Sequence, residues 1–240
     1  KRELQIVMNA WKITLRKTLR AALGLLVCSI GSYCTIVADV GLAPWDALFM
    51  GVSEHLPVSY GTVSVTCGLI VVVVDLLMHE KIGVGMLLDA FMVGKVIDLL
   101  RYLDVLAQPT SYAMRVGLMI LGITILCCGL PIYMGAGLCC GPRDALLVGL
   151  GKRVRKIPIG VVNMIMFAVV VLVTLMLRGP IGIGTLLAVA LQGPIMQLVF
   201  HITHFEPRDV EQESLIETFR KLFPVHVPDP AAAEDVTRNS

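Results

Sequence analysis

Apolar positions along the chain fall into blocks of about 20 residues, separated by short polar or glycine-rich stretches. A helix needs about 20 such residues to cross the hydrocarbon layer of a membrane. The blocks predict six spanning helices, at residues 19–38, 58–78, 86–106, 113–134, 158–177 and 185–202. The predicted fold class is therefore an all-α membrane protein.

Two shorter apolar stretches, too short to span, begin with the same motif. Pro44-Trp45-Asp46 opens the first, and Pro142-Arg143-Asp144 opens the second, 98 residues later. Proline suits the first turn of a helix, where its missing N–H costs nothing. The aspartate then lies in the first turn, near the positive end of the helix dipole. Each stretch is predicted to form a short helix that lies at the membrane edge or dips into it.

A second motif recurs at almost the same offset. Ile82-Gly83-x-Gly85 precedes the third span, and Ile181-Gly182-x-Gly184 precedes the sixth, 99 residues later. Several spaced positions that agree at one offset indicate an internal duplication. Residues 19–106 and 107–203 are the predicted halves, and each consists of a span, a motif helix, a span, a glycine turn and a span.

An odd number of spans per half predicts that the second half enters the membrane from the opposite side. Lysine and arginine collect in cytoplasmic loops, so their positions provide an independent test. The 39–57 loop contains neither, whereas the 135–157 loop contains Arg143, Lys152, Arg153, Arg155 and Lys156. Both arguments predict two inverted three-helix repeats with both termini in the cytoplasm.

The two ends of the chain are more polar than its middle. Residues 1–18 are predicted to be a basic cytoplasmic juxtamembrane segment, or an amphipathic helix on anionic lipid. Residues 204–240 are predicted to be a cytoplasmic tail, with an amphipathic helix at 209–223 and a disordered end from Pro228. Only 16% of all residues are charged, which is low for a soluble domain. The clustered basic residues therefore indicate topology, and no nucleic-acid partner is expected.

Polar and ionisable residues within this apolar frame are the candidate site. An unpaired charge at mid-membrane costs about 3 kcal/mol or more, so such residues are functional candidates by default. The candidate substrate or ion ligands are Asp46, Asp144, Arg143, Lys95, Asp98, Gln192 and Gln197. The candidate gating or turn residues are Pro44, Pro142, Gly83, Gly85, Gly182 and Gly184.

Each candidate also has a structural interpretation, which the sequence leaves open. Asp46 and Asp144 can stabilise the starts of their helices without binding anything. Lys95 and Asp98 have the spacing of a helical ion pair. The glutamines flank Gly193-Pro194, where the helix is expected to be interrupted, and they can satisfy freed backbone groups there.

These motifs resemble those of a known family. Gly41-Leu42-Ala43-Pro44-Trp45-Asp46-Ala47-Leu48, the Ile-Gly-x-Gly-x-Leu-Leu turn and Gly-Pro-Arg-Asp-Ala-Leu are similar to the YczE/YitT-like bacterial integral membrane proteins. The resemblance covers residues 19–203 and implies a multi-span protein of the bacterial cytoplasmic membrane. Two positions depart from the pattern, since Cys139-Cys140 replaces small apolar residues and Lys95 replaces a neutral one.

Inverted repeats with short or broken helices are a common design of secondary transporters. We therefore expect a small secondary transporter or exporter of a small solute. An anionic solute is one option, since helix N-termini bind anions, and a proton is the candidate coupling ion. The alternative is a non-transporting scaffold or regulator of a partner complex. The chain contains no catalytic triad, zinc signature or phosphate loop in a plausible context, so neither an enzyme nor a cofactor is expected. The expected partners are the lipid bilayer and the solute, with a homodimer as a further option.

Overall fold

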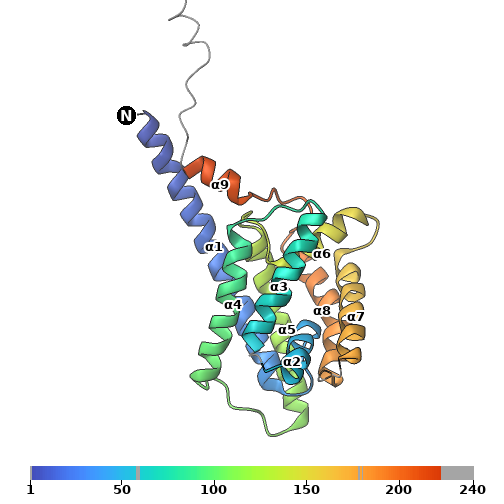
Figure 1. The fold of residues 1–240 in the computed structure, drawn as a ribbon. Coiled ribbons are helices and arrows are strands. Elements are labelled where there is room, and N and C mark those ends of the chain that lie inside the picture. The colour runs from blue at the N-terminus through green and yellow to red at the C-terminus, as the bar shows by residue number, and fades with distance from the viewer. Residues whose placement is uncertain (1, 58–59, 178, 180, 223–240) are drawn as a thin grey trace, which may run out of the picture.

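The computed structural model describes residues 2–57, 60–177, 179 and 181–222, and all regular structure in this part of the chain is helical (Figure 1). Its nine described helices are α1 (Arg2–Ala38), α2 (Pro44–His55), α3 (Tyr60–Leu77), α4 (Val84–Tyr102), α5 (Tyr112–Met134), α6 (Pro142–Arg153), α7 (Ile159–Met176), α8 (Ile183–Ile202) and α9 (Leu215–Leu222). The predicted all-α class is confirmed. The basic segment and the first span, predicted separately, form one continuous helix.

Four helices in the described residues are long and apolar enough to cross a membrane. They are Met8–Ala38 within α1, and α5, α7 and α8. Of the other two predicted spans, α3 has a shorter apolar part, Val63–Leu77, and α4 carries several charged residues. The chain is therefore a multi-pass helical protein, and α3 and α4 are the two helices whose sequences fit a membrane least well.

Helices α1 and α5 pack against each other through small residues. A Cβ atom on Gly129 would lie 2.8 Å from the carbonyl oxygen of Gly24, and one on Gly31 would lie 2.6 Å from that of Gly122. Small residues permit such close approach of two backbones in a membrane. The two contacts show that the helices run antiparallel. The two contacts are equivalent under the repeat. Gly24 corresponds to Gly122, and Gly31 corresponds to Gly129, each 98 positions later.

A second pair of contacts joins the glycine turns to the loops before the motif helices. The Gly85 N–H donates to the Leu138 carbonyl oxygen at 2.7 Å, and the Gly184 N–H donates to the Val40 carbonyl oxygen at 2.7 Å. A Cβ atom on Gly85 would overlap the backbone of Cys139. Each motif helix is thus anchored, just before it begins, by the glycine turn of the other half of the chain.

The two halves differ in how their last two helices pack. Helix α7 packs along α8, and a Cβ atom on Gly160 would lie 2.5 Å from the Gly193 carbonyl oxygen. Their counterparts α3 and α4 barely touch among the described residues, and a Cβ atom on Gly94 would meet open space. The first half is therefore opened between α3 and α4.

The tail crosses the end of the bundle near α6. The Glu213 N–H donates to the Gly137 carbonyl oxygen at 2.9 Å, and the Leu215 N–H donates to that of Ile82 at 2.9 Å. Helix α9 begins at Leu215, later than predicted, and lies beside α1 (Figure 1). Ile216 and Phe219 on this helix are exposed. The predicted disordered end from Pro228 lies outside the described residues.

Candidate functional site

The two motif helices begin in the same way. Pro44 and Pro142 each occupy the first turn, as predicted, and Asp46 and Asp144 are the acidic residues of those turns. The N-cap residues before them, Ala43 and Gly141, make no side-chain cap bond. Neither N-cap residue therefore caps its helix through a side chain, and the positive ends of the two helix dipoles lie beside carboxylates.

Both helix starts line one buried cavity of about 80 Å³. A water molecule takes about 30 Å³ of liquid volume, so the cavity holds a few waters or a very small solute. Asp46, Arg143 and Asp144 come from the motif helices, and Asp89 comes from α4. Asp46 and Asp89 are each only 8% exposed. Three carboxylates and one guanidinium therefore share a small space that is largely closed to solvent.

Tyr133 at the end of α5 fixes one of these carboxylates. Its hydroxyl donates a hydrogen bond to Asp144 and accepts one from the Gly141 N–H at 3.4 Å. Tyr133 is 2% exposed, whereas Asp144 is partly buried, so the contact lies at the edge of the buried core. A Cβ atom on Gly141 would overlap the Asp89 carboxylate, which places that carboxylate against the start of α6. Tyr133 and Gly141 thus hold Asp144 and Asp89 on the same wall.

Two further polar groups point to an occupant of the cavity. The indole N–H of Trp45 and the amide nitrogen of Asn163 both lie among its lining residues. Neither atom has a hydrogen-bond partner within the described part of the chain. Asn163 is 3% exposed, and an unsatisfied buried donor costs about 1–3 kcal/mol. Water or a polar ligand in the cavity would satisfy both groups.

Arg143 connects this cavity to a second hollow. Its guanidinium lies 5.8 Å from the centre of the Phe49 ring on α2, which is the geometry of a cation–π contact. Arg143, Asp46 and Asp89 also line a cleft of about 260 Å³ between α3 and α4. The charged group therefore lies where the small cavity and the larger cleft meet.

The remaining predicted ligands are placed less uniformly. Gln192 lines the cavity, whereas the Gln197 side chain accepts a hydrogen bond from the Gly160 N–H at 3.3 Å and supports the packing of α7 on α8. Lys95 and Asp98 are exposed on α4 and line neither the cavity nor the cleft. Asp98 lies near Asp46 only across a separate small hollow of about 20 Å³.

Asp89, Tyr133 and Asp75 were not among the candidates predicted from the sequence. Tyr133 is the only tyrosine inside the predicted fourth span, which was an available signal. Asp75 on α3 is fully buried, and neither carboxylate oxygen has a hydrogen-bond partner among the described residues. Its position in the second predicted span marks it as a further candidate for function.

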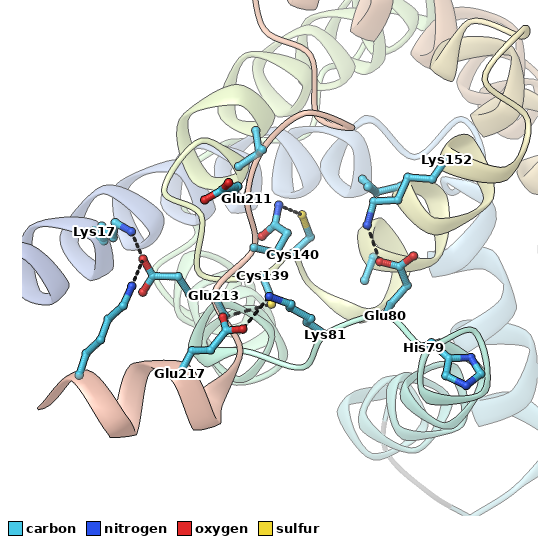
Figure 2. Close-up of a pocket in the computed structure, with 15 residues that line it drawn as sticks. Lys17, His79, Glu80, Lys81, Cys139, Cys140, Lys152, Glu211, Glu213 and Glu217 are labelled. Atoms are coloured by element: carbon cyan, nitrogen blue, oxygen red, sulfur yellow. Dashed lines mark hydrogen bonds and ion pairs between the residues drawn. The ribbon is translucent and has the colours of Figure 1, made fainter. Parts of the chain in front are cut away.

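A larger hollow of about 650 Å³ lies where the tail crosses the bundle (Figure 2). Most of its charged side chains are paired: for example, Lys152 lies 2.6 Å from Glu80, and Lys81 lies 2.7 Å from Glu217. Burial raises the pKa of the Cys139 thiol to about 12. Cys139 is therefore a neutral thiol at physiological pH, unlike a metal-binding or redox-active cysteine. The Lys81–Glu217 pair attaches the tail, whereas the Lys152–Glu80 pair joins α6 to the segment that follows α3. We place the functional site in the cavity between the motif helices.

Comparison with known proteins supports the membrane assignment. Residues 15–201 match the model of a family described as "Family of unknown function (DUF6198)". The chain belongs to this family. A relative in Bacillus subtilis (strain 168), the "Uncharacterized membrane protein YczE", is 30% identical over 180 residues, which cover 72% of this chain and 80% of the relative. The expected membership of a YczE-like family is confirmed.

Two other relatives of this DUF6198 chain match over a similar length. The "Uncharacterized protein YyaS" of Bacillus subtilis (strain 168) is 27% identical over 195 residues, covering 76% of this chain and 92% of the relative. An "Uncharacterized protein" of Haemophilus influenzae is 26% identical over 180 residues, covering 74% and 80%. No solved structure matches the chain at a significant level. None of these names states a substrate.

Proposed function

We propose that the protein is a small secondary transporter that exchanges protons for a small cationic solute at the cavity between its motif helices. One observation carries the proposal. Asp46 and Asp144, from motifs 98 residues apart, line one buried cavity with Asp89 and Arg143. Buried ionisable residues inside a membrane protein mark ion pathways and proton relays. Short or broken helices whose N-termini face such a cavity are typical of transporter binding sites.

The proposed architecture is six spans in two inverted repeats, with α3 and α4 as the two additional spans. It is supported by the antiparallel glycine contacts of α1 with α5, because the repeat offset converts each of these contacts into the other. The paired bonds from Gly85 to Leu138 and from Gly184 to Val40 support it in the same way. A pseudo-two-fold axis in the membrane plane would give the cavity two equivalent mouths, one on each side.

The charge of the cavity favours a cation over the anion that sequence alone left as an option. Its lining includes three carboxylates and a single guanidinium. An additional anion would meet an excess of negative charge, whereas a proton or an organic cation would offset it. Competition of both for the same carboxylates would couple proton movement to solute movement. Asp89 is the proposed proton carrier of the cavity.

We propose the bacterial cytoplasmic membrane as the location, with both termini in the cytoplasm. Basic residues support this orientation, because Lys152, Arg153, Arg155 and Lys156 lie at the end of α6 or just after it. The tail meets the same end of the bundle, since Arg155 lies 3.8 Å from Asp209. Lys17 of α1 pairs with Glu213 of the tail. Lys17 of α1 and the described part of the tail therefore lie at the same end of the bundle as the basic loop.

The test is proton movement in proteoliposomes that contain the purified full-length protein and a trapped pH-sensitive dye. Addition of tetrapropylammonium outside should drive protons out of acidic liposomes faster than in protein-free liposomes. Asp89→Asn should abolish this difference, whereas Asp98→Asn, at an exposed position of the same helix, should retain it. Proton movement equal to that of protein-free liposomes in the unaltered protein would contradict the proposal.

A second candidate function is a membrane scaffold that docks a partner through its tail. The observation that favours it is the exposure of Ile216 and Phe219, which are 73% and 61% exposed on α9. Replacing both with serine should release a partner that cross-links to α9 in cells and leave cation-driven proton movement intact. The scaffold loses support if the same cross-linked proteins are recovered from the double variant.

A further inference from the structure

The cleft between α3 and α4 has mostly apolar walls, and it leads to the charged side chains of Asp46, Asp89 and Arg143. Its volume is about 260 Å³. Its walls include Val65, Leu69 and Val72 from α3, and Leu87, Phe91 and Val93 from α4. Asp46, Asp89 and Arg143 lie in the same lining. A molecule in this cleft would therefore contact hydrocarbon side chains along its body and two carboxylates and a guanidinium at the charged part.

The rim of the cleft lies on the side of the bundle. Leu69 is 61% exposed, Phe91 is 70% exposed, and Val65 and Leu87 are also exposed. In the proposed six-span topology α3 and α4 cross the membrane, so this rim faces acyl chains rather than water. Large exposed apolar residues around an opening indicate a surface that contacts lipid or an apolar ligand.

The opening is specific to the first half of the chain. Its counterpart between α7 and α8 is closed by the backbone contact of Gly160 with Gly193. The first half has glycines at both corresponding positions, Gly61 and Gly94. Gly94 nevertheless faces open space. The sequence therefore has the glycines that would permit α3 and α4 to pack as closely as α7 and α8, yet the two helices lie apart in the structure.

We propose that this cleft binds a lipophilic organic cation, which enters sideways from the lipid bilayer. The apolar walls accept its hydrocarbon body, and Asp46 and Asp89 outnumber Arg143 and attract its positive charge. This inference rests on the proposed function and names the substrate class of the same carrier. A lipid with an anionic headgroup would need the opposite charge balance. A helix from a second copy of the protein would contact only the apolar walls, and its binding would not require the charged side chains.

The experiment compares two ions of nearly equal shape and opposite charge. Full-length protein in lipid nanodiscs is dialysed against radiolabelled tetraphenylphosphonium or tetraphenylborate, and binding to empty nanodiscs is subtracted. Tetraphenylphosphonium should bind with a stoichiometry near one, and tetraphenylborate should bind about tenfold more weakly or less. Asp89→Asn should weaken phosphonium binding by about tenfold or more, because a buried charge pair is lost.

Two glycine variants test the location. Gly94→Leu places a side chain inside the cleft and should block phosphonium binding. Gly117→Leu is the matched control, since Gly117 on α5 also faces open space but lies outside the cleft. Thermal unfolding of both variants checks that they remain folded. Equal loss of binding in both variants would overturn the assignment of the cleft.

Each other outcome is also decisive. Equal binding of the two ions, or preference for tetraphenylborate, would overturn the cation proposal, and the latter would favour an anionic headgroup at Arg143. Cross-linking of a cysteine at Leu69 to a second copy, with no phosphonium binding, would identify a dimer interface instead. Phosphonium binding without cation-driven proton movement would contradict the proposed transport function, while the cleft would remain assigned as a cation-binding site. Proton movement with tetrapropylammonium but no phosphonium binding would contradict only the cleft.

Discussion

The Tyr133 hydroxyl donates a hydrogen bond to Asp144, and this contact joins the end of α5 to the start of α6 within the buried cavity. The same hydroxyl accepts from the Gly141 N–H, immediately before the motif helix. One side chain therefore sets both the position of a carboxylate and the start of the helix that carries it. In the first half, the residue 98 positions earlier is Thr35, whose hydroxyl donates to the Ser32 carbonyl oxygen within α1. The two motif aspartates consequently have different surroundings.

Replacement of Tyr133 by phenylalanine should destabilise the protein. The variant removes a hydrogen-bond donor from the partly buried carboxylate of Asp144, at a cost of about 1–3 kcal/mol. The measurement is thermal unfolding of the purified protein in detergent, monitored by intrinsic fluorescence. Tyr102→Phe is the matched control, because Tyr102 is 86% exposed and should change the unfolding temperature little. Equal effects of the two substitutions would show that the Asp144 contact contributes no measurable stability.

Replacement of Gly85 by alanine should also destabilise the fold. The new methyl group would overlap the Cys139 backbone and displace the turn that bonds to Leu138. Overpacking of this kind typically costs about 1–3 kcal/mol. Gly68→Ala in α3 is the control, since its methyl group meets open space. Alanine also favours a helix over glycine by about 1 kcal/mol, so the control should be neutral or stabilising. Urea-dependent unfolding of both variants in mixed micelles compares them.

The inverted topology predicts opposite exposure of the ends of the two motif helices. Single cysteines at Leu56, after α2, and Val154, after α6, would be introduced into a background that lacks the seven natural cysteines. Both positions are exposed in the structure. A membrane-impermeant maleimide on intact cells should label position 56, and it should label position 154 only after the membrane is opened. Labelling of both positions from the same side would refute the inverted repeat.

The attachment of the tail should weaken in acid. Burial raises the pKa of Glu213, but hydrogen bonds from Lys17 and Lys221 outweigh it and hold the pKa below the ordinary glutamate value. A folded-state pKa that is depressed stabilises the attached tail above the unfolded value of about 4.3, and this stabilisation is lost as the pH falls through the folded pKa. The protection of residues 210–222 against hydrogen exchange, measured relative to the intrinsic exchange rate at each pH, should therefore fall on acidification below that value.

Glu213→Gln tests the source of this pH dependence. The variant should exchange faster than the unaltered protein at neutral pH and should lose most of its acid dependence. Asp209→Asn is the control, since Asp209 pairs with Arg155 at 3.8 Å and both side chains are largely exposed. Exposed pairs contribute about 0–1 kcal/mol, so this variant should retain the acid dependence. An unchanged pH profile in Glu213→Gln would assign the effect to another group.

The sequence by itself determined the features that depend on local composition. Apolar blocks predicted the long helices, because a chain in lipid must satisfy its backbone within each segment. Proline predicted the starts of both motif helices, since its missing N–H costs nothing in the first turn. At Pro194, however, the expected interruption is wrong, because α8 continues through that residue. The repeat offset identified equivalent positions in the two halves, and two of these, Gly85 and Gly184, make equivalent contacts in the structure.

Only the tertiary structure decided which polar side chains share a cavity. Asp89 and Asp98 lie on the same helix, and the rotation of α4 about its axis buries the first and exposes the second. Membrane helices are apolar on most faces, so periodicity does not fix that rotation, and packing of small residues on neighbouring helices does. The gap between α3 and α4 likewise follows from contacts between distant segments. Gly94 and Gly193 are alike in the sequence, yet only Gly193 meets another helix.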